Sequence, residues 1–200
     1  FNDLYYSADN GLAETQHVFL SGNNLPKRFS TGFQIAELGF GTGLNLLVAL
    51  AAWRKSGVKG VLYFTSFEAF PLTPEQMIIA HQAFPELKEI ATELASLWGN
   101  TITLPDLKFD LILGDARDTL PAWHKKADAW FLDGFAPTKN PELWEPTLMA
   151  DVAQHTKPGG SCSTYTAAGF VRRSLQKAGF SITRTPGFGR KRHMTKGTRQ

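Results

Sequence analysis

The sequence predicts a doubly wound α/β fold, in which a mostly parallel sheet carries helices on both faces. Apolar runs typical of strands alternate with helical patterns along most of the 200 residues, as in repeated βαβ units. A glycine-rich turn, Glu37-Leu-Gly-Phe-Gly-Thr-Gly43, follows the first of these runs and precedes a helical pattern. Acidic residues stand at the ends of successive predicted strands, where such sheets bind ligands.

The first strand is predicted at residues 33–37 and its helix at residues 44–53. Gly39, Gly41 and Gly43 lie between them, and glycines let a tight turn bring the backbone close to a ligand. A dinucleotide-binding loop spaces its glycines as G-x-G-x-x-G, and this loop departs from that pattern by one residue. The pattern E-x-G-x-G-x-G instead resembles the first motif of methyltransferases that use S-adenosylmethionine (SAM). A glycine-rich turn in another kind of α/β protein is the alternative.

The following elements continue the alternation. A strand is predicted at residues 61–68, and a helix runs from Pro74 to about Phe84 with Thr73 as its N-cap. Residues 86–98 have a further helical pattern, and residues 101–104 form a short strand. The segment before the first strand has weak periodicity, so residues 1–30 are expected to wrap the sheet as a loop with short helices.

The second half of the chain repeats the pattern with shorter elements. Helices are predicted at residues 117–123, 142–155 and 170–178, and strands at residues 109–114, 127–133, 161–166, 181–185 and 192–195. The turn Pro158-Gly-Gly160 is expected to end the second of these helices, and Gly179 is expected to stop the third.

The composition fits one soluble domain of the cytoplasm. Of the 200 residues 42% are apolar, enough to bury a sizeable core. Apolar stretches stay far below the ~20 residues of a membrane-spanning helix, and no signal peptide is visible, so no membrane partner is expected. Cys162 is the single cysteine, which fits a core thiol in a reducing compartment. The chain opens at Phe1 without an initiator Met, which indicates a fragment of a longer protein.

Carboxylates stand at the ends of four predicted strands, at Glu37, Glu68, Asp115 and Asp133. Open α/β sheets bind ligands at the carboxyl ends of their strands, near the switch in strand order, so the site is expected there. Each acid alone is equally explained as a helix N-cap or a solvated loop residue. The whole set favours a binding site, because buried Asp and Glu are rare unless they are paired.

Charge is distributed unevenly along the chain. The net charge is only +3, yet residues 171–200 contain no Asp or Glu. A one-sided basic segment is typical of a nucleic-acid-binding surface, and a solvated surface with a frayed terminus is the alternative. The basic residues of this segment are Arg172, Arg173, Lys177, Arg184, Arg190, Lys191, Arg192, Lys196 and Arg199.

Several specific blocks of sequence accompany the glycine loop. The most distinctive are Trp130-Phe-Leu-Asp-Gly-Phe-Ala-Pro137 and Gly187-Phe-Gly-Arg-Lys-Arg192, and the others are Asp9-Asn-Gly-Leu-Ala-Glu-Thr15, His17-Val-Phe-Leu20, Ser66-Phe-Glu-Ala-Phe-Pro-Leu72 and Ala168-Gly-Phe-Val-Arg-Arg173. Together they resemble the bacterial tRNA 5-aminomethyl-2-thiouridine methyltransferases over nearly the whole chain. The chain departs from that pattern at Ala69, where a basic residue is expected.

This resemblance implies a class I, Rossmann-like methyltransferase fold with a seven-stranded, mostly parallel sheet and a C-terminal antiparallel strand. Residues 31–200 would form the SAM-dependent domain, and residues 1–30 an N-terminal extension around its core. The implied reaction is N-methylation of the 5-aminomethyl group of 5-aminomethyl-2-thiouridine at the tRNA wobble position. The family occurs alone or fused to an oxidase half, and FAD would belong only to such a fused C-terminal half.

The resemblance and the strand-end positions together imply a cofactor-binding set. Glu37 is expected at the amino-acid end of SAM, Glu68 at the ribose hydroxyls and Asp115 at the adenine. The N-cap of the following helix is an alternative role for Asp115. The predicted cofactor-binding residues are Glu37, Gly39, Phe40, Gly41, Gly43, Asn45, Glu68, Asp115, Ala116 and Asp133.

Asp133 is predicted to carry the reaction. Asp133-Gly-Phe-Ala-Pro137 loosely resembles the Asp/Asn-Pro-Pro-aromatic motif of amino-methyltransferases. The carboxylate would accept a hydrogen bond from the attacking nitrogen and stabilise the positive charge that develops there. Whether it also receives the proton stays open. No metal is expected, because the five histidines are scattered without ligand spacing.

The substrate side is predicted from the same blocks. Phe135 is expected either to stack on the flipped wobble base or to fill the core, and Lys139 and Asn140 to contact the base or a phosphate. Basic residues would hold the backbone of the anticodon arm of tRNA. These are Arg172, Arg173, Arg190, Lys191 and Arg192.

Other function classes remain open from the sequence. A nicotinamide-dependent oxidoreductase would bind NAD, but the glycine spacing argues against it. A non-catalytic RNA-binding module with a relic cofactor fold would bind tRNA without SAM. A methyltransferase acting on another amine or on a protein differs from the tRNA enzyme only by the family resemblance.

Overall fold

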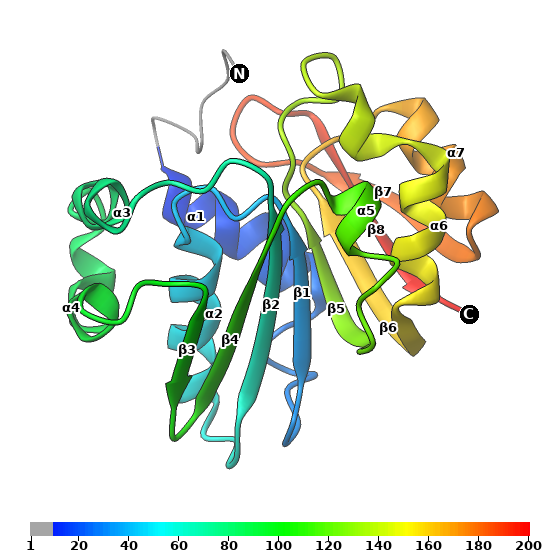
Figure 1. Ribbon diagram of the computed structural model, residues 1–200. Helices are drawn as coiled ribbons and strands as arrows, with labels where there is room; N and C mark the ends of the chain where they lie inside the picture. Colours follow the sequence, from blue (N-terminus) through cyan, green and yellow to red (C-terminus); the bar gives the residue numbers. More distant parts are fainter. Residues whose placement is uncertain (1–9) are drawn as a thin grey trace.

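The computed structural model describes residues 10–200, and these form an eight-stranded sheet with the strand order β3-β4-β2-β1-β5-β6-β8-β7 (Figure 1). Strands β4, β2, β1, β5 and β6 are parallel, whereas β3 is antiparallel to β4, and β8 is antiparallel to β6 and β7. The α/β class, the mostly parallel sheet and the C-terminal antiparallel strand are confirmed. The strands are β1 (Gln34–Leu38), β2 (Leu62–Glu68), β3 (Thr101–Leu104), β4 (Leu107–Leu113), β5 (Ala127–Leu132), β6 (Thr156–Thr164), β7 (Phe180–Pro186) and β8 (His193–Arg199).

Among the described residues the sheet has one strand more than the seven implied by the resemblance. The additional edge strand is β3, which pairs with β4 so that Leu104 lies opposite Leu107. Only Pro105 and Asp106 connect the two strands, and such a short connection produces a hairpin. This hairpin extends the sheet beyond β4, on the side away from β5 and β6.

Helices cover both faces of the sheet, as predicted (Figure 1). One layer contains the elements from the N-terminal part and the first half of the chain, and the other contains the elements that follow β4. The first layer consists of α1 (Gly11–Thr15), η1 (Gln16–Leu20), η2 (Ser21–Asn23), α2 (Leu44–Ser56), α3 (Pro74–His81), η3 (Pro85–Leu87) and α4 (Lys88–Ala95). The second consists of α5 (Ala116–Thr119), η4 (Pro141–Trp144), α6 (Pro146–Gln154) and α7 (Gly169–Lys177).

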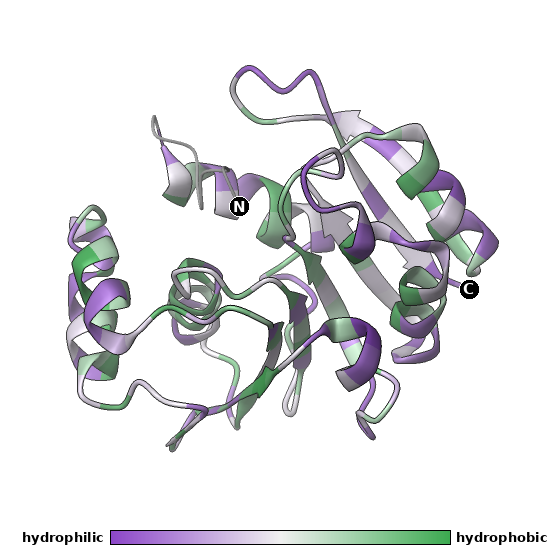
Figure 2. Ribbon diagram, turned by 45° about the horizontal axis from the view of Figure 1, so that its top comes forward, coloured by the Kyte–Doolittle hydropathy of each residue, from purple (hydrophilic) through white to green (hydrophobic). Residues whose placement is uncertain are grey.

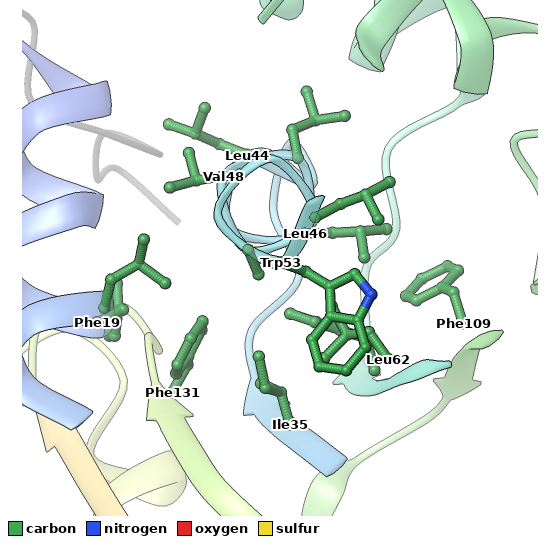
Figure 3. Packing of buried hydrophobic residues seen from close by; sticks show 14 of the residues in the cluster. Phe19, Ile35, Leu44, Leu46, Val48, Trp53, Leu62, Phe109 and Phe131 are labelled. Carbon is green, nitrogen blue, oxygen red and sulfur yellow. The ribbon is translucent and has the colours of Figure 1, made fainter. Parts of the chain in front are cut away.

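Side chains of the central strands alternate between the two layers, because successive residues of a strand point to opposite faces. Ile35 and Phe131 pack into the layer around α2, while Ala36 and Trp130 pack into the layer around α6 and α7. Figure 3 shows Ile35 beside Trp53 of α2 and Phe131 facing Phe19 of η1. This two-sided burial makes the parallel strands a rigid base for the residues that follow their carboxyl ends.

Two predicted elements of the second half were wrong in their extent. The helix predicted at residues 142–155 is divided into η4 and α6, because Pro146 lacks an N–H and holds Glu145 extended at φ −63° and ψ 148°. The turn predicted at Pro158-Gly-Gly160 lies inside β6, which begins at Thr156. Gly159 has φ +73°, and the pairing of β5 with β6 shifts register between Ala127 and Ala129, so the strand continues through an irregular stretch.

The other predicted helices have correct positions but differ in length. The helix predicted at residues 44–53 is longer, since α2 runs to Ser56, and α7 has the predicted length but begins one residue earlier, at Gly169. The helix predicted from Pro74 to about Phe84 is shorter, since α3 ends at His81. The helix predicted at residues 117–123 is α5, a single turn that ends at Thr119, and the helix predicted at 86–98 becomes η3 and α4. The predicted ends are confirmed where the sequence contains specific signals. Thr73 and Gln76 form a reciprocal capping box at the start of α3, and Gly179 follows α7 with φ +98°.

The described part of the N-terminal segment, residues 10–30, contains the short elements α1, η1 and η2. Val18 and Phe19 of η1 are buried in the core beside α2, so this stretch packs on the sheet layer. Residues 1–9 of the predicted extension, including Asp9 of the family-like block, lie outside the described residues. The boundary between residues 1–30 and 31–200 stays a prediction. Within residues 10–200, none of the helices has the length and apolar character needed to span a membrane.

Candidate active site at the carboxyl edge of the sheet

A cavity of about 1090 Å³ opens at the carboxyl edge of the sheet. The strand order reverses beside β1, since β2 lies on one side of it and β5 on the other. Ligands of open α/β sheets bind at such a switch point. Pockets for small ligands have volumes of about 300–1000 Å³, so this cavity has room for a cofactor and part of a second molecule. Its walls come from the segments after β1, β2, β4 and β5, together with α1 and the β7–β8 loop.

The glycine-rich loop forms one wall with its backbone. Gly39 and Gly41 line the cavity with φ +87° and +53°, values that side-chain-bearing residues rarely adopt. A Cβ on Gly39 would lie 2.7 Å from the carbonyl oxygen of Asp133, so the missing side chain lets this loop approach the end of β5. Gly43 does not line the cavity; its φ is +77°, and a Cβ there would lie 2.9 Å from the Phe40 ring. Gly43 therefore serves packing.

Phe40 contributes to the cavity chiefly through its backbone. Its residue is only 4% exposed, and its ring stacks on Phe109 with 5.1 Å between centroids. Glu68, the last residue of β2, fixes the loop there, because its Oε2 accepts hydrogen bonds from the N–H groups of Phe40 at 2.9 Å and Gly41 at 3.2 Å. Its Oε1 accepts from the N–H of Phe70 at 2.8 Å. A carboxylate oxygen accepts about two hydrogen bonds, so Glu68, which lines the cavity, keeps acceptor capacity for a ligand hydroxyl.

Glu37 and Asp133 are joined through one amide. Nδ2 of Asn45, in the first turn of α2, donates to Glu37 Oε1 at 2.8 Å and to Asp133 Oδ2 at 2.7 Å. Ser66 donates its hydroxyl to Glu37 Oε2 at 2.6 Å. Asn45 and Asp133 line the cavity, whereas Glu37 is fully buried beneath them. The structure therefore brings Asp133 to the cavity, whereas Glu37 lies behind Asn45 and not at the cavity surface.

Both carboxyl groups of this arrangement have a raised pKa, and burial is the main cause in each. Burial raises the pKa of Asp133 to about 8; the negative charge of Glu14 acts in the same direction, and the hydrogen bond from Asn45 opposes it. Burial also raises the pKa of Glu37 well above its ordinary range, against the hydrogen bonds from Ser66 and Asn45. Perturbed carboxyl groups in a cavity are typical of functional sites.

Asp115 lines the cavity and also caps α5. Its Oδ1 accepts from the N–H of Arg117 at 2.9 Å, so the alternative N-cap role is present in the structure. The Arg117 guanidinium donates to both carboxylate oxygens, and these bonds hold the pKa of Asp115 below its usual value. Ala116, the first residue of α5, lines the cavity beside it. A role at an adenine stays a prediction for both residues.

The segment after β5 forms the opposite wall. Gly134, Phe135 and Asn140 line the cavity, whereas Lys139 does not. Trp144 donates from Nε1 to the carbonyl oxygen of Phe135 at 2.9 Å and is almost completely buried, which anchors this segment to η4. Whether Phe135 stacks on a base stays a prediction; its side chain is partly buried at the cavity.

The predicted basic residues divide into two groups. Arg190 and Lys191, in the mostly hydrophilic loop between β7 and β8, line the cavity (Figure 2). Arg172, Arg173 and Arg192 lie outside it. Partial desolvation and then the positive charges of Arg184, Arg192 and Arg172 lower the pKa of His193, so these arginines share one electrostatic neighbourhood. Two of the five predicted basic residues therefore line the cavity, and the other three lie outside it.

Sequence reasoning missed several residues of the cavity. Glu14 of α1 and Tyr165 after β6 line it, as do Arg117 and Phe188. Glu14 and Phe188 lie within blocks that carry the family resemblance, and Tyr165 lies at the end of the strand predicted at residues 161–166, a position like that of the four acids. Strand-end position was therefore a usable signal for Tyr165. No periodic signal existed for Glu14, because residues 1–30 lack a clear pattern.

With the site described, comparison with known proteins decides the family. The family described as S-adenosyl-L-methionine-dependent methyltransferase matches residues 81–200. The chain belongs to this family. The methyltransferase has the class I fold: a crystal structure of MNMC2 from Aquifex aeolicus, 30% identical, aligns with a TM-score of 0.77 over 96% of this chain and 63% of that one. The glycopeptide N-methyltransferase MtfA, 16% identical with a TM-score of 0.56, shares the fold alone.

Curated relatives of this methyltransferase are longer proteins. It is 43% identical over 100% of its length to the tRNA 5-methylaminomethyl-2-thiouridine biosynthesis bifunctional protein MnmC of Hahella chejuensis. It is 45% identical over 99% of its length to the protein of the same name from Aliivibrio fischeri. The chain spans 34% and 32% of these relatives, which is about a third of each.

The residues at the cavity fit the cofactor that defines the family. SAM carries hydroxyls and amines that need acceptors, and a sulfonium cation that favours an acidic environment. The cavity offers the carboxylates of Glu68, Asp115 and Asp133 along one edge, with glycine backbone at Gly39 and Gly41 close by. The individual residue roles stay predictions.

Proposed function

We propose that this methyltransferase transfers the SAM methyl group to the 5-aminomethyl group of 5-aminomethyl-2-thiouridine at the tRNA wobble position. The product would be 5-methylaminomethyl-2-thiouridine. The proposal rests on two supports that agree. Relatives 43% and 45% identical are named for the biosynthesis of that nucleoside in tRNA. The cavity places a carboxyl group with a raised pKa, Asp133, beside space for a second molecule.

Residues on the β2–β4 side of the cavity would hold the cofactor. Gly39 and Gly41 would approach SAM with their backbone, Glu68 would accept hydrogen bonds from the ribose hydroxyls, and Asp115 with Ala116 would bind the adenine; all five residues line the cavity. When bound, SAM supplies a methyl group already activated by the positive sulfur. The leaving group therefore needs little activation, and the main task of the protein is to position the acceptor and to stabilise the charge that develops on it.

Asp133 would orient the acceptor and handle its proton. A primary amine attacks only in its neutral form, so an acceptor that arrives as an ammonium has to lose a proton first. The ionised Asp133 carboxylate accepts a hydrogen bond from the nitrogen and stabilises the positive charge that grows there during attack. Asn45 fixes the Asp133 side chain through the 2.7 Å bond and connects it to the buried Glu37.

The predicted basic residues would hold the anticodon arm. Arg190 lines the cavity, while Arg172 and Arg192 lie outside it and act electrostatically on His193. Phosphate contacts of this kind position an RNA without reading its sequence.

We place the reaction in the cytoplasm, where tRNA is available. Of the two arrangements that the resemblance implies, a standalone enzyme or one fused to an FAD-dependent oxidase half, the fused one agrees with relatives named as bifunctional, of which this chain spans about a third.

Transfer of a labelled methyl group tests the proposal. Purified protein is incubated with SAM carrying a deuterated methyl group and with tRNA that bears 5-aminomethyl-2-thiouridine. Digestion to nucleosides and mass spectrometry should show labelled 5-methylaminomethyl-2-thiouridine. The matched control is the same tRNA with unmodified 2-thiouridine, which offers no amine and should gain no label.

Two results would overturn the proposal. A folded, SAM-binding protein that leaves the aminomethyl nucleoside unlabelled would exclude this substrate. Label appearing equally in the tRNA without the aminomethyl group would show that the acceptor is a different atom.

A further inference from the structure

The ammonium of Lys191 is held at the cavity by two groups. Its Nζ donates to Glu14 Oε1 at 2.7 Å and lies over the Tyr165 ring, 4.1 Å from the centroid. The Glu14 side chain is 13% exposed and the Lys191 side chain 46% exposed. A carboxylate and an aromatic face together form a cage for an alkylammonium ion.

The cage is built from residues that the protein fixes independently of Lys191. Tyr165 donates its hydroxyl to the carbonyl oxygen of Gly134 at 2.7 Å, and its ring meets Trp144 edge to face at 6.4 Å. Glu14 lies in the short helix α1, whose N-cap Asn10 accepts from the N–H of Ala13. Lys191 lies in the loop between β7 and β8 with its side chain 46% exposed, so its ammonium can leave the cage without disturbing a helix or a strand.

The cage adjoins the group that is predicted to carry the reaction. Glu14, Tyr165 and Lys191 line the same cavity as Asp133. Asp133 responds to both charges, because Glu14 raises its pKa and Lys191 lowers it. Tyr165 binds Gly134, the residue that directly follows Asp133. A cation in the cage therefore lies in the same cavity as Asp133 and close enough for its charge to act on that carboxyl group.

We propose that Glu14 and Tyr165 form the binding site for the aminomethyl ammonium of the substrate, and that Lys191 occupies this site in the RNA-free protein. The inference rests on the proposed function, since it names the residues that select its acceptor. Both cations are primary alkylammonium groups, so the same carboxylate and ring suit either one. Substrate entry would displace Lys191, which is then released toward the phosphates of the anticodon arm.

The proposed substrate site can be distinguished from a purely structural role of the ion pair between Glu14 and Lys191. If the bond between Glu14 and Lys191 only fastens α1 to the β7–β8 loop, removing either partner loosens the same contact. Both changes would then weaken every RNA equally. In the proposed cage the two changes act in opposite directions on the selection of the amine, because one removes the site and the other removes its competitor.

Binding of two anticodon stem-loops measures this selection. One carries 5-aminomethyl-2-thiouridine and the other 2-thiouridine, and both are titrated with the full chain in the presence of S-adenosylhomocysteine, which prevents turnover. The ratio of the two Kd values cancels phosphate contacts, which both RNAs share. A charge-assisted contact should make the ratio about tenfold or more in favour of the amine for the unchanged protein.

Glu14→Gln should bring this ratio close to one, whereas Lys191→Met should increase it. Tyr165→Leu should reduce it, while Glu89→Gln, on the exposed side of α4, is the charge-matched control and should leave it unchanged. An unchanged ratio in Glu14→Gln, or a fall in Lys191→Met, would overturn the cage. Circular dichroism and SAM affinity of each variant establish that it is folded.

The labelled-methyl assay on the same samples keeps the two proposals apart. Label transfer together with an amine selection that ignores Glu14 would refute the cage and keep the proposed function. Amine selection that depends on Glu14, without label transfer, would support the cage and refute the proposed reaction.

Discussion

Asp133 combines two properties that oppose each other at neutral pH. It lines the cavity, where an ionised carboxylate would serve an amine, yet burial raises its pKa to about 8. Bound cations shift that balance, because an opposite charge within a few ångströms favours the ionised form. The sulfonium of SAM and the acceptor ammonium are both positive, so the loaded site would ionise Asp133 more readily than the free site.

The pH dependence of the reaction follows from this residue. Because Asp133 is ionised above about pH 8 in the free protein, kcat/KM should rise between pH 6 and 8 and level off above that. The measurement is a pH profile of methyl transfer at subsaturating tRNA. Asp133→Asn should be nearly inactive at every pH, with no rise near 8. A flat profile in the unchanged protein would contradict the role of this carboxyl group.

The close approach of Gly39 to the end of β5 predicts that a side chain at this position weakens SAM binding. Gly39→Ala places a Cβ 2.7 Å from a backbone oxygen at φ +87°, so the loop must move away from β5. The strained conformation costs about 1–3 kcal/mol of folding free energy, and SAM affinity should fall at least tenfold. Gly57→Ala is the control, because its φ is +72° but nothing lies within 4 Å of the added Cβ. Calorimetry with SAM should show a weakened Gly39 variant and an unchanged Gly57 variant.

For helices and strands, the sequence predicted an end correctly where a capping residue marks it, and less well where only periodicity or composition indicated it. Periodicity alone suggested one helix over residues 142–155, and it missed that Pro146 imposes a break. The turn expected at 158–160 followed from Pro and Gly composition, but tertiary pairing with β5 carries β6 through this stretch. Pairing partners are not visible in a local pattern, which is why these two elements were wrong.

The capping box of α3 gives a test at this scale. Thr73 accepts from the N–H of Gln76 at 3.3 Å, and the Gln76 side chain accepts from the N–H of Thr73 at 2.9 Å. Thr73→Ala removes one of the two bonds and should lower the free energy of unfolding by about 1 kcal/mol. Urea denaturation measures it. Thr73→Ser keeps the hydroxyl and should retain most of the stability; equal losses in both variants would argue against the cap.

In the molecule as a whole, the acids at the ends of several strands meet at one cavity, which Arg190 and Lys191 also line. The strand-end rule located Glu68, Asp115 and Asp133 at one cavity from the sequence, because parallel strands share a carboxyl edge. It did not reveal that Glu37 lies beneath the cavity surface, since side-chain depth depends on how α2 packs on the sheet. Nor did it reveal Glu14, which reaches the site only through the placement of α1.

If Arg190 and Arg192 contact tRNA phosphates, the affinity for tRNA should depend on salt concentration through these two residues. Arg190→Glu combined with Arg192→Glu should weaken tRNA binding and flatten the slope of log K against log salt by about 0.7–0.9 per lost phosphate contact. Filter binding between low and physiological salt measures the slope. Lys88→Glu on α4 changes charge away from these two arginines and should alter neither quantity. An unchanged slope in the double variant would remove these arginines from the RNA surface.

We expect Asp133 to act on the acceptor amine, while other residues of the cavity bind SAM. The variant Asp133→Ala separates these two roles. Asp133→Ala is compared with the unchanged protein in two measurements on the same sample, SAM affinity by calorimetry and kcat for methyl transfer to aminomethyl-bearing tRNA. In Asp133→Ala, kcat should fall by about 10²-fold or more, as expected when a group that stabilises developing charge is lost, while the Kd for SAM should stay nearly unchanged. A Kd for SAM that rises as steeply as kcat falls would contradict it, because Asp133 would then serve the cofactor and not the acceptor.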